Sequence, residues 1–115
     1  MNSINESIVN DVTAAWNQLE PELIIKHLDE SFVYDSQWVF ESLDFQGYID
    51  YIRNKFAALK RGNSSIKAET ITDTYCGGTM TKITQYNLET QQSNIAFYRV
   101  RINDEKIIKG DLCMF

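Results

Sequence analysis

The amino-acid sequence predicts an α+β fold in which three helices of the N-terminal half cover a cone-shaped, curved antiparallel sheet. Three observations support this class. Apolar residues recur at helical spacing in three stretches before residue 62. An aromatic and β-branched run between Phe32 and Leu43 interrupts them and is typical of strands. After Ser64 the chain is rich in Thr, Ile, Tyr and Val, with turn residues at regular intervals. With 115 residues, the chain is predicted to form one domain over 1–115.

The first two helices are predicted from their capping residues. Ser3 followed by Glu6 fits a capping box, in which each side chain bonds to the other residue's backbone N–H. Pro21 ends this helix and suits the first turn of a second one, which extends to about Leu28. The residues expected to face the core are Ile8, Val12, Ala15, Trp16 and Leu19 in the first helix, and Leu23, Ile24 and Leu28 in the second.

A third helix is predicted after a cap at Asp44. It runs to about Arg61, and Gly62 is expected to end it in the left-handed conformation. Its predicted buried stripe consists of Phe45, Tyr48, Ile49, Ile52, Phe56 and Leu59.

The remaining segments are predicted strands. Two short ones, Phe32–Asp35 and Trp38–Leu43, precede the third helix, and four follow Ser64. The turns expected between these four are Gly77-Gly78, Gln92-Ser93-Asn94 and Asn103-Asp104. From the alternation of one strand we expect Ala96, Tyr98, Val100 and Ile102 to face the helices, and Phe97, Arg99 and Arg101 to face outward.

Charge and composition argue against several kinds of partner. The net charge of −5 disfavours nucleic acid, and the dense basic cluster Lys60-Arg61 ends a predicted helix, where cations suit the helix dipole. No apolar run approaches the roughly 20 residues that span a membrane. The N-terminus lacks the features of a secretion signal. We therefore expect a cytoplasmic protein with Cys76 and Cys113 reduced, although their spacing leaves a disulfide open.

Asp35 is the leading candidate for chemistry. The chain has no Gly-rich phosphate loop, no ligand pair at metal spacing and a single histidine, so we expect neither a metal nor a cofactor. A carboxylate in an aromatic strand would be partly desolvated, which raises its pKa and makes it a general base. Alternatively it faces solvent, because only one of Tyr34 and Asp35 can face the chamber. Tyr98 and Asp111 are its candidate partners, although Asp111 would equally pair with an outward arginine.

Four aromatic residues are predicted to bind a ligand: Trp16, Trp38, Phe56 and Tyr86. Large apolar rings of this kind are also common in protein cores and dimer contacts, and a buried phenol often bonds only to backbone. His27, at the end of the second predicted helix, is expected at the surface.

The order of these elements resembles the nuclear transport factor 2-like superfamily, whose fold is also called polyketide-cyclase, SnoaL-like, ketosteroid-isomerase-like or cystatin-like. The resemblance covers the whole chain. It rests on Ala14-Ala15-Trp16-Asn17, the short helix to Leu28, Asp29 through Asp35, and Gln46-Gly47 at the third helix. The block Gln37-Trp38-Val39-Phe40-Glu41 is similar to small uncharacterised bacterial members.

This resemblance implies a conical chamber between helices and sheet, and a homodimer through the sheet. It aligns Asp35 with the proton-shuttling aspartate of ketosteroid isomerases. Val12 stands where that group keeps its oxyanion-hole tyrosine, and the position of its protonated acid falls near Tyr98. Steroid isomerisation is therefore not expected, because the missing donor normally stabilises the transition state.

Three hypotheses follow for the function. The first is a pocket protein that binds a small apolar molecule with one polar group. The second is an isomerase-, dehydratase- or hydrolase-type enzyme that uses Asp35 as its base. The third is a module that pairs through its sheet with itself or another protein. Fold alone does not choose among them.

Overall fold

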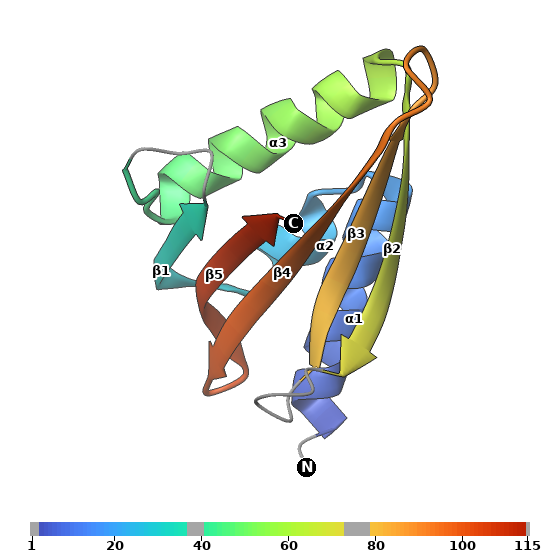
Figure 1. Ribbon diagram of the computed structural model, residues 1–115. Coiled ribbons are helices and arrows are strands. Elements are labelled where there is room, and N and C mark those ends of the chain that lie inside the picture. The colour runs from blue at the N-terminus through green and yellow to red at the C-terminus, as the bar shows by residue number, and fades with distance from the viewer. Residues whose placement is uncertain (1–2, 37–40, 73–78, 115) are drawn as a thin grey trace.

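The computed structural model describes residues 3–36, 41–72 and 79–114, which form three helices and one five-stranded sheet. The helices are α1 (Ser3–Gln18), α2 (Glu22–Ile25) and α3 (Phe45–Arg61). The strands are β1 (Leu28–Ser36), β2 (Ser64–Thr72), β3 (Thr79–Asn87), β4 (Ser93–Asn103) and β5 (Lys106–Met114). In Figure 1, α3 crosses one end of the sheet, and α1 and α2 lie behind it. The predicted α+β class is confirmed.

The sheet has the strand order β1-β5-β4-β3-β2. From β2 to β5, each strand is antiparallel to the next one along the chain, as predicted. In contrast, β1 pairs with β5 in parallel, with Val33 opposite Lys109 and Asp35 opposite Asp111. The cause is the path of the chain: α3 carries it from β1 to the opposite edge, and after three reversals β5 arrives beside β1 in the same direction (Figure 1).

Helix α1 packs on β2 and β3, and its side chain Asn17 holds the edge strand β2. Its amide Nδ2 donates to the Ala68 carbonyl at 2.9 Å, and its Oδ1 accepts from the Ala68 N–H at 2.7 Å. Asn17 therefore satisfies backbone groups that an edge strand would otherwise leave open. The buried residues of α1 are Ile8, Val9, Val12, Ala15 and Trp16.

Helix α2 is shorter than predicted, because β1 begins at Leu28. The Ile107 N–H donates to the His27 carbonyl at 2.8 Å, and Leu28 pairs with Ile107 in the sheet. Pairing with β5 therefore replaces the last helical turn that the sequence predicts for these residues.

Helix α3 begins as predicted. The Asp44 side chain caps it by accepting from the Gly47 N–H at 2.8 Å. The predicted left-handed stop at Gly62 is wrong, since this residue has φ −87° and ψ 179°, which is extended backbone. The buried residues of α3 are Tyr48, Ile49, Ile52 and Phe56, and Phe45 and Leu59 are partly buried against them.

The second predicted strand, Trp38–Leu43, is a single bridge within the described residues. Leu43 exchanges two backbone hydrogen bonds with Tyr34, at 2.8 and 2.9 Å. Trp38 and Phe40 lie outside the described residues, and so do Cys76 and the predicted turn Gly77-Gly78.

Of the two other predicted turns, one matches the structure and one does not. Asp104 and Glu105, with φ of 50° and 62°, join β4 to β5. Two successive positive φ values are typical of a type I′ hairpin turn. Residues 92–94 are not a turn, because β4 already begins at Ser93. The turn precedes them at residues 88–90, where the Asn87 Oδ1 accepts two backbone N–H groups.

The predicted alternation of β4 is confirmed. Ala96 and Tyr98 are buried, whereas Arg99 and Arg101 are exposed. We therefore call the side of the sheet that faces the helices the inner face and the other side the outer face. None of the helices in the described residues is long and apolar enough to cross a membrane.

Candidate functional site

Tyrosine side chains fill the deep part of the space between the inner face and the helices. Tyr34, Tyr48 and Tyr98 are each at most 2% exposed. The ring centroids of Tyr34 and Tyr48 are 4.7 Å apart, and the hydroxyls of Tyr48 and Tyr98 share a hydrogen bond of 2.9 Å. Burial raises the pKa of all three phenols, because a phenolate would lose its hydration there. This part of the predicted chamber is therefore filled with neutral side chains.

A hollow of about 50 Å³ remains beside this tyrosine cluster, on the inner face of β3, β4 and β5. We call it the Trp16 cavity. It is lined by Trp16 from α1, Lys55 from α3, Ile83 and Gln85 from β3, Asn94 and Ala96 from β4, and Leu112 from β5. Its walls combine apolar side chains with a few polar groups, which is the usual composition of a small-molecule site.

Trp16 contributes one wall of this cavity. Its indole Nε1 is buried and lacks a hydrogen-bond partner in the part of the chain that the structure describes. Indole can only donate, and a buried donor without a partner is costly. The Phe56 ring packs edge-to-face against the Trp16 ring, with the two centroids 4.8 Å apart at an interplanar angle of 71°. Of these two residues predicted to bind a ligand, Trp16 lines the cavity, whereas Phe56 packs against Trp16.

Lys55 is the residue that our sequence analysis missed. It lies three positions after Ile52 and seven after Tyr48, and therefore on the apolar side of α3. Desolvation by burial lowers the pKa of its ammonium group. Within the described residues it makes neither an ion pair nor a hydrogen bond. Its position beside the buried stripe of α3, three residues after Ile52, was a signal in the sequence that could have identified it.

Asp35 does not lie in the chamber. Its side chain is 43% exposed on the outer face, and Tyr34 occupies the inner position instead. The Ser42 hydroxyl donates to the Asp35 carboxylate and lowers its pKa, and the Lys109 ammonium at 3.5 Å adds to this effect. The predicted desolvated base with a raised pKa is therefore wrong, because strand alternation turns the residue after an inward tyrosine outward.

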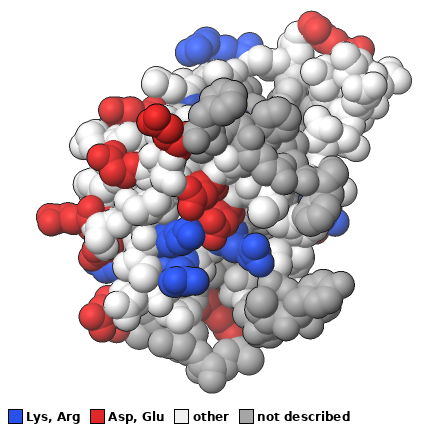
Figure 2. Space-filling view, turned by 60° about the vertical axis from the view of Figure 1, so that its left-hand side comes forward, with Lys and Arg blue, Asp and Glu red and all other residues white. Residues whose placement is uncertain are grey.

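The other predicted site residues are dispersed. Asp111 lies beside Asp35 on the outer face, 3.9 Å from the Lys109 ammonium. Figure 2 shows acidic and basic side chains in contact on this side of the molecule. Tyr86 is 36% exposed near the end of β3, so the structure does not bring it to the chamber. Tyr98 is on the inner face, but its hydroxyl bonds to Tyr48.

His27 forms part of a surface contact between α1 and the turn before β1. Its Nε2 is 2.7 Å from the Asp11 carboxylate, which also lies 3.4 Å from the Lys26 ammonium. The hydrogen bond from His27 is the main cause that lowers the pKa of Asp11. This contact has a structural explanation, since it joins two neighbouring elements.

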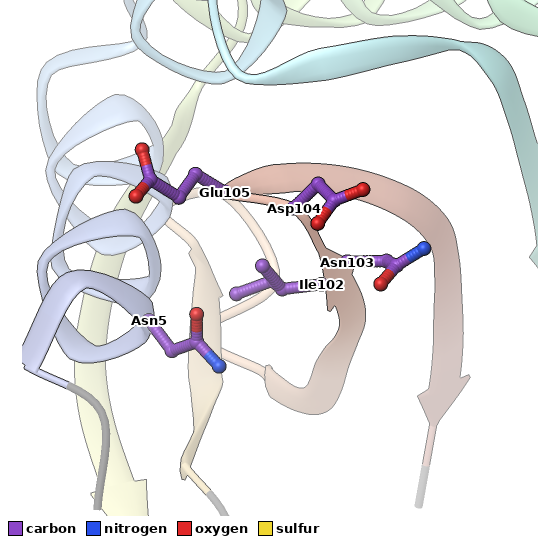
Figure 3. Close-up of a pocket in the computed structure, with 5 residues that line it drawn as sticks. All are labelled: Asn5, Ile102, Asn103, Asp104 and Glu105. Atoms are coloured by element: carbon purple, nitrogen blue, oxygen red, sulfur yellow. The ribbon is translucent and has the colours of Figure 1, made fainter.

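A larger hollow of about 500 Å³ lies at the β4–β5 turn beside α1. It is lined by Asn5, Ile102, Asn103, Asp104 and Glu105. Figure 3 shows the side chains of Asp104 and Glu105 pointing in opposite directions, so the two carboxylates do not converge. Across the described ranges, no three His, Cys, Asp or Glu side chains are grouped to hold a metal ion. Cys113 is a free thiol. We therefore regard the Trp16 cavity as the candidate site.

These features define a small α+β protein in which a sheet and its helices enclose a pocket. No protein-family model and no curated protein matches the chain. Among solved structures, a protein of unknown function from Mesorhizobium loti, described as nuclear transport factor 2-like, is similar with a TM-score of 0.74 and 10% identity over 98% of this chain and 92% of that one.

Two further structures agree. A protein described as a putative ketosteroid isomerase from Kribbella flavida has a TM-score of 0.72 and 9% identity, over 98% of this chain and 78% of that one. A ketosteroid isomerase-like protein from Catenulispora acidiphila, in complex with trimethylamine, has a TM-score of 0.65 and 17% identity, over 92% and 83%. The chain has the nuclear transport factor 2-like fold.

Proposed function

We propose that this protein binds a small molecule with an apolar body and one polar group in the Trp16 cavity. The observation that carries the proposal is a cavity whose walls combine apolar side chains with a few polar ones. Ile83, Ala96 and Leu112 offer apolar contact, while Lys55, Gln85 and Asn94 offer polar groups. Binding of a small organic molecule by a protein of this fold, the trimethylamine complex, supports the same reading.

Binding is a better proposal than catalysis for this cavity. None of its seven lining residues is a carboxylic acid, a histidine or a cysteine. General acid–base chemistry most often uses such groups within hydrogen-bonding reach of the substrate. Asp35 and Asp111, the candidate acids, are on the opposite face of the sheet.

A filled-cavity variant tests the proposal. Ala96→Val adds two methyl groups at the wall of the cavity and should abolish ligand-induced shifts of backbone amides in two-dimensional NMR spectra. Ala68→Val is the matched control, because Ala68 is also buried on a strand but does not line the cavity. A screen of small acids, amides, ketones and amines that shifts no cavity resonance in the unmodified protein would refute the proposal.

The outer face supports a second function, assembly of a homodimer. Charges of both signs lie close together there. Asp35 and Asp111 lie beside Lys109 of β5, and Arg101 of β4 is opposite Lys109. Val33, 37% exposed, adds an apolar contact point. A two-fold axis can pair such a surface with itself, placing acids against bases.

Sedimentation at increasing protein concentration tests this assembly. We expect a dimer that Arg101→Glu weakens, whereas Lys60→Glu at the end of α3 leaves it unchanged. A chain that remains monomeric at high concentration would refute it.

A further inference from the structure

We propose that the open edge of β2 is a self-association surface that fits β2 of a second copy of this chain, and that the Asn17 side chain blocks it. The two strands would pair antiparallel about a two-fold axis at Ala68. This inference is independent of the Trp16 cavity and of the outer face. It depends on how the two edges of the sheet are covered, on the hydrogen bonds of Asn17, and on the order of charges along β2.

The sheet has two edge strands, β1 and β2, and the chain covers them differently. At β1, the backbone of Leu43 exchanges two hydrogen bonds with Tyr34, at 2.8 and 2.9 Å. At β2, which forms the right-hand edge of the sheet in Figure 1, a side chain takes this role, since Asn17 of α1 bonds to Ala68 in the middle of the strand. An open edge strand is a template for a strand of another chain, because its unpaired N–H and C=O groups point outward.

Asn17 occupies the two backbone groups that a partner strand would use. Its Nδ2 donates to the Ala68 carbonyl and its Oδ1 accepts from the Ala68 N–H. Both groups of Ala68 therefore point away from β3 and toward the open edge. In an antiparallel pair, two residues that lie directly opposite each other exchange these same two bonds. The Asn17 amide, with its donor and its acceptor, thus takes the place of a backbone residue opposite Ala68.

The charges along β2 favour a second copy of the same strand as the partner. Lys67 and Glu69 flank Ala68, and both side chains are exposed, with the ammonium and carboxylate groups 3.3 Å apart. A two-fold axis at Ala68 places Lys67 of each copy opposite Glu69 of the other. Opposite charges in facing positions stabilise a strand pair, whereas like charges destabilise it. An axis at Lys67 or at Glu69 would place that residue opposite its own copy, so the charges select the register at Ala68.

Asn17→Ala tests the proposal, because it opens the edge without changing the charges of β2. Every variant of the full chain, and the parent, carries Arg101→Glu, so that assembly through the outer face does not contribute. We expect sedimentation equilibrium to show dimers of Asn17→Ala at a concentration about tenfold lower than for the parent, because two backbone hydrogen-bonding groups become available. Gln18→Ala, an exposed neighbour on the same helix, is the matched control and should behave as the parent.

Charge variants in the Asn17→Ala background test the partner and its register. Lys67→Glu places Glu69 of each copy opposite a second glutamate and should weaken the dimer roughly tenfold, because two facing pairs become repulsive. Adding Glu69→Lys restores opposite charges across the pair and should restore the dimer. Lys60→Glu makes the same change of charge at the end of α3 and should leave the dimer unchanged.

Hydrogen exchange of the Ala68 amide reports whether the dimer uses this edge. In Asn17→Ala this amide should exchange quickly in the monomer at low concentration and become protected again as the dimer forms at higher concentration. Circular dichroism checks that the variant is folded. If Asn17→Ala does not fold, Asn17→Ser takes its place, because a serine side chain is polar but too short to make both bonds.

The outcomes decide the proposal in either direction. A dimer that the charge-swapped variant restores, with a protected Ala68 amide, would support it. Folded Asn17 variants that remain monomeric at high concentration would overturn it. A dimer that Lys67→Glu does not weaken, or one in which the Ala68 amide stays unprotected, would show that another surface is used and would overturn it as well.

Discussion

The hydroxyl of Tyr98 occupies the space that a side chain on Gly110 would need. A Cβ atom built on Gly110 would lie 2.7 Å from the Tyr98 hydroxyl oxygen and 3.1 Å from the Phe32 ring. Because Gly110 has no side chain, the phenol of Tyr98 from the neighbouring strand β4 packs closely against β5 at this position. In that position the Tyr98 hydroxyl reaches Tyr48 and forms their buried hydrogen bond.

We predict that Gly110→Ala destabilises the protein by about 1–3 kcal/mol, the usual cost of overpacking a core. The free energy of unfolding in urea measures this. Combining Gly110→Ala with Tyr98→Phe removes the closest contact, so the double variant should lose less stability than the sum of the two single variants. Strict additivity, or an alanine variant as stable as the unmodified protein, would contradict this account of the glycine.

The residues of the candidate site were only partly predictable. Trp16 was predicted because it lies on an apolar helical stripe and is aromatic. Asp35 was placed on the wrong face, since a strand with Tyr34 and Asp35 side by side satisfies the alternating pattern in either orientation. Lys55 was overlooked because charged residues on helices are usually exposed. The contacts that distinguish these cases are long-range and cannot be read from local spacing.

At the scale of the elements, α1 acts as a cover for the edge of the sheet. Besides the two hydrogen bonds of Asn17 with Ala68, the Thr13 hydroxyl is 2.7 Å from the Thr70 hydroxyl on β2 and 2.9 Å from the Thr81 hydroxyl on β3. Thr81 is fully buried, so this contact satisfies a polar group inside the core. Polar contacts thus fix the register of the helix over the strands.

We predict that Asn17→Ala lowers the free energy of unfolding by about 1–2 kcal/mol, because it removes two hydrogen bonds at a partly exposed site. Hydrogen exchange of the Ala68 amide should accelerate at the same time, since its acceptor is gone. Gln18→Ala, an exposed neighbour on the same helix, is the control and should change neither quantity. Unchanged exchange at Ala68 would mean that the edge strand does not need Asn17.

The elements were more predictable than their partners. Asp44 as a cap and the turn near Asp104 are local signals, and both are found in the structure within a residue. The early end of α2 and the parallel pairing of β1 with β5 depend on residues about 80 positions apart, Leu28 and Ile107 among them. Local propensity does not contain such information, and tertiary pairing overrides it.

At the scale of the whole molecule, the buried tyrosines couple stability to alkaline pH. Below about pH 10, phenols are neutral in both the folded and the unfolded chain, so their contribution to stability is fully present. Above that pH the unfolded chain releases protons, whereas burial raises the pKa of Tyr34, Tyr48 and Tyr98 in the folded protein. Stability is therefore lost as the pH rises towards the folded pKa values.

Lys55 acts in the opposite direction over a lower range. Burial lowers its pKa, so the folded chain gives up this proton before the unfolded chain does, and stability rises with pH until the ordinary lysine value of about 10.4 is passed. Above that value the contribution of Lys55 no longer changes with pH. Of Lys55 and the three buried tyrosines, only the tyrosines then make the free energy of unfolding depend on pH.

We therefore predict that the free energy of unfolding falls steeply above about pH 10.5, by up to about 4 kcal/mol per pH unit, since each of three protons contributes about 1.4 kcal/mol. Urea titrations at pH values from 9 to 11.5 measure the slope, and tyrosinate absorbance should rise together with the loss of circular dichroism. Tyr34→Phe should reduce the slope by about a third, because one titrating group is gone. Tyrosinate formation by these residues well before unfolding would contradict the prediction, since it would mean that water reaches the tyrosine cluster in the native protein.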